Sequence, residues 1–177
     1  MVNQKPGFLE KPGFFSVGAP ETWFPAETGF LSTDGFNAMP IKHKRWNDPR
    51  KRGDGFRLLV CRYRPRALPK ADETWNASWP ELGPSKKLHA DFYGKNGPPI
   101  GWEEYRQRYL EEMKAQAELI DELADLVIAG KTITLLCSSA CEDATHCHRT
   151  LLKQLIEERI AEKQKSLAQQ LPSGPEP

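Results

Sequence analysis

One short stretch of the sequence gathers most of the residues that could do chemistry. Residues 137–149, CSSACEDATHCHR, hold three of the four cysteines and two of the four histidines. Thiolates and imidazoles act as nucleophiles, acid–base groups and zinc ligands, so their density here predicts a functional site. Positive charge accompanies them, because Arg149 ends the stretch and a group of arginines occurs at residues 62–66.

An activated thiol is the first interpretation of this stretch. Leucines and isoleucines at residues 151–160 recur at helical spacing, so a helix is expected to begin near Cys147. A helix N-terminus and neighbouring cations lower the pKa of a thiol. We therefore predict that Cys147 is the most acidic of the four thiols and a catalytic nucleophile, with His148 or His146 as its acid–base partner. The alternative is a buried cap residue without chemistry.

Zinc coordination is the second interpretation. Cys137, Cys141, His146 and Cys147 could surround one ion, although Cys-x3-Cys-x5-Cys-His lacks the two separated ligand pairs of most structural zinc sites. The protein would then be a zinc-stabilised interaction module. A disulfide is less favoured, because the first residues lack a secretory apolar segment and a cytoplasmic location with reduced thiols is expected. No cofactor is predicted, and zinc stays an alternative.

The elements that must position these residues follow from apolar patterns. Short apolar runs at 41–46, 56–61 and 132–137 predict strands, and the stripe of apolar residues along 102–129 predicts one long helix. The strand–helix–strand–helix order predicts an α/β fold with a small, mostly parallel sheet flanked by helices, in a Rossmann-like three-layer domain. Ser85 is predicted to cap a further, shorter helix.

The ends of the predicted strands indicate where a ligand would bind. In parallel sheets, ligands bind beyond the carboxyl ends of the strands, and a helix N-terminus there favours anions. Arg62 and Arg64 follow one strand, whereas Arg149 lies at the start of the helix that follows the other. We therefore expect these arginines to flank one cleft that binds a phosphate- or nucleotide-like anion.

The charge distribution also indicates an anionic partner. The net charge is only +1, but residues 41–70 carry eleven Lys and Arg against two Asp and Glu. Such a concentration favours one small anionic ligand. Nucleic-acid binding is the alternative, with the basic segment 42–70 on phosphates and Trp46, Tyr63 or Trp75 stacked on bases. No segment reaches the ~18 apolar residues of a membrane helix, so no membrane contact is expected.

Changes of pattern predict the domain organisation. Residues 1–38 are rich in Pro and Gly and have neither helical nor strand period, which predicts an irregular extension. Residues 39–168 are predicted to form a single α/β domain. Residues 169–177 are predicted to be a disordered tail.

Several motifs, in order, resemble one known family. FRLLVCRYRPRALPK, LGPSKKLHADFYG and TLLCSSACEDATHCHRTLL resemble the domain of unknown function 488 family, and its YeaO-like branch in particular. The resemblance spans about residues 39–157 and implies a compact α/β domain without an assigned activity. CRYRPRA stands where that branch has DRLWPRG, so Ala67 replaces a glycine. The family motifs complete the predicted ligand-binding set, which is Arg62, Arg64, Arg66, Ser85, Cys137 and Arg149.

Overall fold

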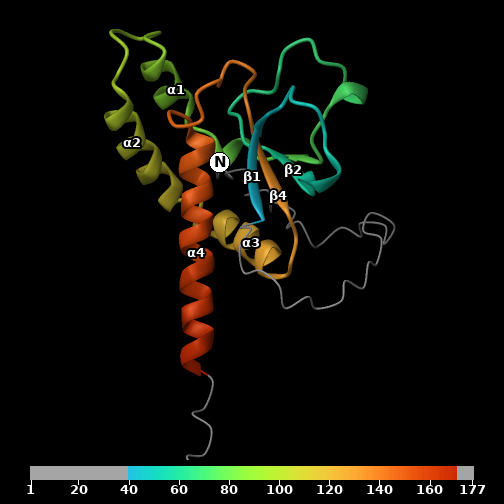
Figure 1. Cartoon of the computed structure of the whole chain (residues 1–177). Coiled ribbons are helices and arrows are strands. Elements are labelled where there is room, and N and C mark those ends of the chain that lie inside the picture. Colours follow the sequence, from blue (N-terminus) through green and yellow to red (C-terminus); the bar gives the residue numbers. More distant parts are fainter. Residues whose placement is uncertain (1–39, 171–177) are drawn as a thin grey trace, which may run out of the picture. The chain divides into compact units, whose positions relative to one another are not determined.

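The computed structural model describes residues 40–170 (Figure 1). The predicted extension at residues 1–38 lies outside the described residues, as do residues 171–177 of the predicted tail. The described chain contains one sheet of four parallel strands in the order β1-β4-β2-β3. The predicted α/β class and parallel sheet are confirmed. The strands are β1 (Ile41–Arg45), β2 (Phe56–Leu59), β3 (Ala77–Ser78) and β4 (Ile133–Cys137).

β4 occupies the centre of the sheet and is buried along its whole length. Ile133 pairs with Ile41 of β1 on one side, and Arg45 pairs with Cys137 at the far end of the same two strands. On the other side, Leu136 of β4 pairs with Leu59 of β2. Because the strands are parallel, their carboxyl ends lie at one edge of the sheet.

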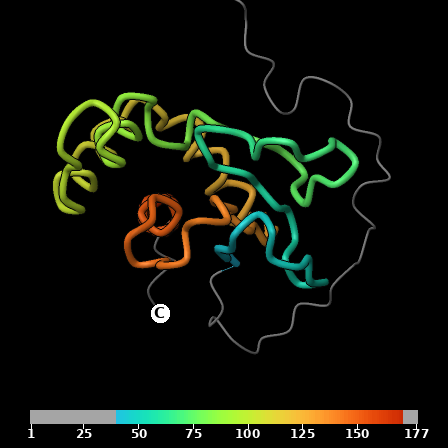
Figure 2. The backbone as a smooth tube through the Cα atoms, turned by 90° about the horizontal axis from the view of Figure 1, so that it is seen from above, coloured from blue at the N-terminus to red at the C-terminus, as the bar shows by residue number. Residues whose placement is uncertain are grey.

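The two faces of the sheet are covered differently. On one face, Leu58, Ile133 and Leu135 share a core with buried side chains of the helices. On the other face, Leu59 and Leu136 pack with aromatic and aliphatic side chains of the segment 46–75. Figure 2 shows α4 on one side of the strands and the segment around residue 70 on the other. That connecting segment contains η2 (Arg52–Asp54) and η3 (Lys70–Asp72), and η4 (Pro80–Leu82) follows β3.

The helices differ from prediction in one respect. The single helix predicted for residues 102–129 is wrong, because α2 (Trp102–Lys114) ends and α3 (Ala117–Ile128) begins within that range. Gln116 has φ −111° and ψ 19°, and its amide donates to the carbonyl of Met113 at 2.9 Å, which closes α2. The turn redirects α3 so that it packs along α4 (His148–Gln170).

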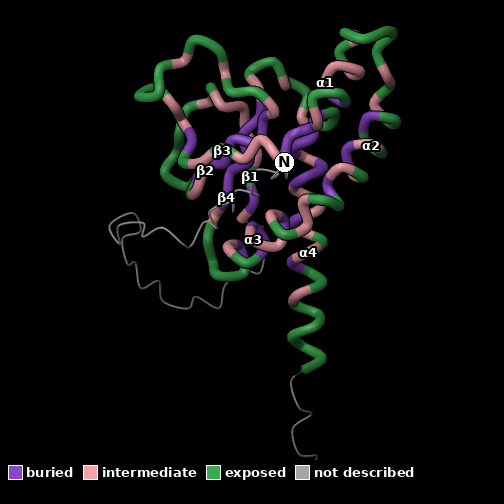
Figure 3. Tube along the Cα trace, turned by 180° about the vertical axis from the view of Figure 1, so that it is seen from behind, coloured by how far each residue is buried: buried purple, intermediate pink, exposed green. Residues whose placement is uncertain are grey.

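The remaining helix ends agree with the sequence. α1 (Lys86–Phe92) begins at Ser85, whose hydroxyl accepts from the amide of Leu88 at 3.1 Å, so the predicted cap is confirmed. α4 begins directly after Cys147, as expected, and continues to Gln170, two residues into the predicted tail. Figure 3 shows burial on the strands and on the helix surfaces facing them, whereas the last turns of α4 are exposed. None of the helices within residues 40–170 has the length and apolarity of a membrane span.

A buried ion pair anchors the start of β2. Arg57 is fully buried and donates to the carboxylate of Asp54 at 2.7 Å. The backbone carbonyl of Asp54 accepts from the hydroxyl of Thr134 on β4 at 2.6 Å. Between them Gly55 has φ 60°, and a Cβ there would lie 2.1 Å from the carbonyl oxygen of Thr132. Glycine is therefore required where the chain enters β2 beside β4.

Candidate functional site

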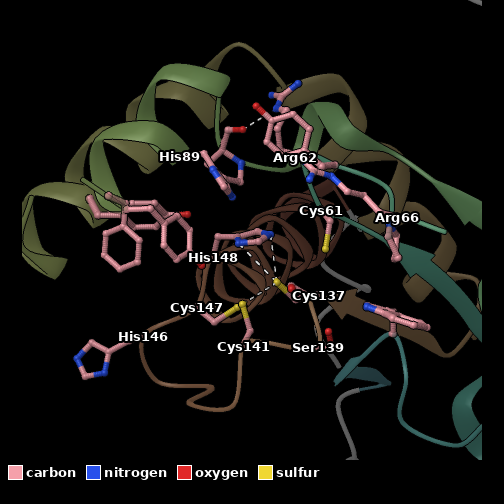
Figure 4. A pocket seen from close by; sticks show the side chains of 18 residues that line it. Cys61, Arg62, Arg66, His89, Cys137, Ser139, Cys141, His146, Cys147 and His148 are labelled. Atoms are coloured by element: carbon pink, nitrogen blue, oxygen red, sulfur yellow. Dashed lines mark hydrogen bonds between the residues drawn. The ribbon is translucent and has the colours of Figure 1, made fainter. Parts of the chain in front are cut away.

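A cavity of about 370 Å³ opens at the carboxyl edge of the sheet (Figure 4). Its lining comes from the residues after β2, from the loop between β4 and α4, and from α1 and α2. The segments that follow β2 and β4, the two strands whose ends were predicted to bind a ligand, therefore line one cavity. Arg62, Arg66, Cys137, Cys147 and His148 of the predicted site all line it.

Aromatic rings form the wall opposite the sulfur atoms. His89 and Tyr93 lie four residues apart on α1 or at its end, with ring centroids 4.8 Å apart, and Tyr63 meets His89 edge-on at 5.3 Å. Tyr63 and Tyr93 are half exposed. No role for His89 or Tyr93 follows from the sequence, although their spacing on a predicted helix places both on one face. Tyr105 of α2 is buried and also lines the cavity.

The predicted arginines have different environments. Arg62 is half-buried, and its Nε donates to the carbonyl of Pro84 at 2.6 Å, which fixes the chain after β2 against the start of α1. Arg66 is exposed and lines the cavity without a hydrogen bond or ion pair to another described residue. Arg64 does not line the cavity, because its guanidinium pairs with Glu73 at 2.8 Å. Ser85 is also outside the lining and serves as the cap of α1.

Three of the four thiols form a cluster at the base of the cavity. The sulfur atoms of Cys137, Cys141 and Cys147 all lie within 4.8 Å of one another, and Cys137 donates to Cys141 at 3.3 Å. Cys137 and Cys147 are buried, whereas Cys141 is half-buried. We call these residues the three-cysteine cluster. Cys61, the fourth cysteine, lines the same cavity but does not belong to the cluster.

Hydrogen bonds within the cluster determine which thiol is acidic. Cys137 and Cys147 donate to the sulfur of Cys141, which lowers the pKa of Cys141 well below that of a free thiol. Hydrogen bonds of Cys147 with Cys137 and with Cys141, together with burial, raise the pKa of Cys147 far above its usual range. The prediction that Cys147 is the most acidic thiol stays a prediction, and the directions of these pKa shifts favour Cys141 instead. A helix N-terminus contributes only ~0.3–1 kcal/mol, and donation to neighbouring sulfur atoms combined with burial outweighs it.

The two histidines of the stretch point in different directions (Figure 4). His148 is buried, and its Nε2 lies 2.9 Å from the carbonyl of Val60, so Nε2 carries the proton. Burial lowers the pKa of His148, which keeps the ring neutral and leaves Nδ1 as an acceptor 3.9 Å from the sulfur of Cys137. His146 is exposed and pairs with Asp143 at 2.6 Å. Of the four candidate zinc ligands, His146 is therefore the one outside the cluster.

Arg149 lies behind the loop rather than in the cavity. Its side chain is only 4% exposed, and Nη2 donates to the carbonyl of Cys141 at 3.1 Å. Among residues 40–170, its Nε and Nη1 have no hydrogen-bond partner and its guanidinium forms no ion pair, although its charge acts on the carboxylate of Asp48. Arg62, Arg64 and Arg149 were expected to flank one cleft. Of these three residues, only Arg62 lines the cavity. Arg149 instead places a buried positive charge beside the loop of the three-cysteine cluster.

Comparison with known proteins identifies relatives of the chain. Residues 41–160 match the family model DUF488-N3a, described as the active DUF488-N3 subclade. The chain is 32% identical over 114 residues to "Uncharacterized protein YeaO" of Escherichia coli (strain K12), an alignment that covers 64% of this chain and 94% of that protein. No solved structure matches the chain significantly. The length of the family match and the extent of the alignment show that this chain belongs to the DUF488 family.

Proposed function

We propose that the protein binds a small anionic compound that carries an aromatic ring, of the mononucleotide type, in the cavity at the carboxyl edge of the sheet. One observation carries the proposal: a single cavity is lined both by arginines after β2 and by half-exposed aromatic rings. Arginine binds phosphate through charge-assisted hydrogen bonds, and aromatic side chains stack on bases. The volume of about 370 Å³ is within the range of ~300–1,000 Å³ typical of small-molecule sites.

The free charge of Arg66 supports an anionic ligand. Arg62 already donates to the backbone of Gly83 and Pro84, so part of its hydrogen-bonding capacity is used. Arg66 lines the same cavity and its guanidinium contacts no described carboxylate. We therefore assign Arg66 the main contact with the anion, and Arg62 the role of shaping the cavity and adding positive potential.

The alternative of nucleic-acid binding has less support. Four of the eleven Lys and Arg residues at 41–70 form ion pairs with nearby carboxylates: the pairs are Lys44 and Arg57 with Asp54, Arg45 with Asp48, and Arg64 with Glu73. Phosphate binding along a nucleic acid needs several unpaired cations spread over one surface. A concave cavity with one unpaired arginine instead suits a small ligand.

The predicted catalytic pair, Cys147 and His148, stays a prediction. Both residues face the cavity and would lie beside a bound ligand. The raised pKa of Cys147 and the neutral ring of His148 give no support for a thiolate at Cys147. Binding is therefore the function that the geometry supports best, and covalent chemistry is not required by it.

Isothermal titration calorimetry of the full chain with AMP, GMP, CMP and UMP tests the proposal, with adenosine and inorganic phosphate as fragments. At least one mononucleotide should bind more tightly than either fragment. Arg66→Gln should weaken its binding by about 10- to 100-fold, because a hydrogen bond to a charged group contributes ~1.5–3 kcal/mol. Arg64→Gln is the matched control, two residues away and outside the cavity, and should change affinity less than twofold. Equal losses in both variants, or no binding at millimolar concentration, would refute the proposal.

A further inference from the structure

We propose that the three-cysteine cluster is a zinc site whose fourth coordination position faces the cavity. Cys137, Cys141 and Cys147 would supply three thiolates. A water molecule, or an oxygen of the anionic ligand, would take the fourth position; this last point rests on the proposed function. A zinc site with three protein ligands and one open position is the arrangement typical of catalytic rather than structural zinc.

The distances between the sulfur atoms are close to those of a formed site. Zinc binds thiolate at ~2.3 Å, so three sulfur atoms in tetrahedral geometry lie about 3.8 Å apart. In the structure all three lie within 4.8 Å of one another, with 3.3 Å between Cys137 and Cys141. Shifts of about an ångström are therefore sufficient to close the site around an ion.

The backbone is suited to such a shift. Cys137 is the last residue of β4, where pairing with Arg45 of β1 fixes it, and Cys147 directly precedes α4. Cys141 lies in the loop between these elements and is the only half-buried member of the cluster. Two ligands are thus held by regular structure, while the third is carried by a segment that can adjust its position.

The buried charge of Arg149 is a second, independent observation. A buried guanidinium without a carboxylate partner is costly unless a negative charge lies nearby. Three thiolates and one Zn²⁺ carry a net charge of −1, which would compensate Arg149 from across the loop. Arg149 already donates to the carbonyl of Cys141, so the cation is attached to the residue whose sulfur would move.

The surroundings leave the fourth position to the cavity. His146 pairs with Asp143 and meets the ring of Trp102 edge-on at 5.2 Å, so it is held away from the sulfur atoms. His148 donates through Nε2 to Val60, and its Nδ1 stays beside the cluster as an acceptor. Cys137 at the end of β4 and the loop that carries Cys141 and Cys147 both line the cavity. An ion bound by these three cysteines would therefore be accessible to a ligand in the cavity.

Metal analysis of the full chain tests the site. The protein is stripped with a chelator under reducing conditions, reloaded with ZnCl₂, desalted and analysed by mass spectrometry for zinc. We expect one zinc ion per chain. Cys141→Ser should weaken zinc affinity by at least about 100-fold, because loss of even an outer-shell partner costs ~10–100-fold. Cys61→Ser is the matched control, a cysteine of the same cavity outside the cluster, and should retain the metal.

Three results would overturn the zinc site: a stoichiometry far below one, retention of zinc by Cys141→Ser, or equal loss in Cys61→Ser. In the first case, rapid alkylation of Cys141 by iodoacetamide would assign the cluster to a metal-free thiolate instead. Mononucleotide binding is measured on the stripped and the loaded protein. Binding by the stripped protein without zinc uptake would leave the proposed function standing, whereas zinc uptake without nucleotide binding would leave the metal site and remove the ligand from its fourth position.

Discussion

Replacement of Asp54 by asparagine should be among the most damaging single changes in the described fold. Asp54 is buried and its carboxylate accepts from Arg57, from Lys44 and from the amide of Lys51. Asp54→Asn would leave the fully buried Arg57 without its counter-charge. Removing one partner of a buried ion pair costs ~3–5 kcal/mol, so we expect a loss of that size in the free energy of unfolding at pH 7.

The pH dependence provides a sharper test. Burial opposes the charge of Asp54, but the hydrogen bonds from Lys44, Lys51 and Arg57 outweigh it and lower the pKa to about 2. An unfolded aspartate titrates at ~3.9, so the carboxylate contributes about 2.6 kcal/mol above pH 5 that is lost as the pH falls towards 2. At pH 3 about half of this contribution to the free energy of unfolding, ~1.2 kcal/mol, is already lost. The destabilisation caused by Asp54→Asn should therefore be smaller at pH 3 than at pH 7 by that amount.

Urea unfolding of the unsubstituted protein and of Asp54→Asn, at pH 7 and at pH 3, measures the free energy lost on substitution at each pH. Asp72→Asn is the control, because Asp72 is exposed in η3 and its replacement should change stability by less than ~0.5 kcal/mol. The reasoning is refuted if Asp54→Asn costs the same free energy at both pH values, or if it costs no more than Asp72→Asn.

Three further changes test the backbone and the domain boundary. Gly55→Ala should destabilise the protein by at least about 3 kcal/mol in urea unfolding, because the new Cβ would overlap the carbonyl of Thr132 and φ is +60°. Ala67→Gly should instead stabilise it by up to about 1 kcal/mol, because Ala67 has φ 57°; a loss would contradict the strain. Removal of residues 1–38 should leave a cooperative thermal transition, and its disappearance would show that the core needs them.

The parts of the fold that could be predicted are those with a strong local signal. Apolar runs bounded by turns located β2 and β4, and Ser85 was identified as a cap from its position before a helical pattern. The ends of parallel strands then placed Arg62 and Cys137 at one edge. The break at Gln116 had no such signal, because the apolar stripe continues across it and neither Gly nor Pro marks the turn.

The chemistry of the site depended on tertiary distances that sequence spacing does not determine. Its place at a helix start predicts an acidic Cys147, whereas hydrogen bonds from Cys137 and Cys147 lower the pKa of Cys141. Similarly, Arg64 and Arg66 are equivalent in the sequence, whereas only Arg64 meets a carboxylate, Glu73. His89 lines the cavity because α1 packs beside it. The spacing of residues within 137–149 carries no information about that packing.

Amide chemical shifts of the full chain, titrated with the mononucleotide that binds best, test the central claim most directly. If the ligand occupies the cavity, the largest changes in the ¹H–¹⁵N spectrum should be those of residues 62–66, 138–148 and α1. The exposed basic residues of 50–52 should shift little, because they lie outside the cavity lining. Changes confined to residues 42–52, or spread evenly along the basic segment, would contradict a cavity site and indicate nucleic-acid-like binding on the surface.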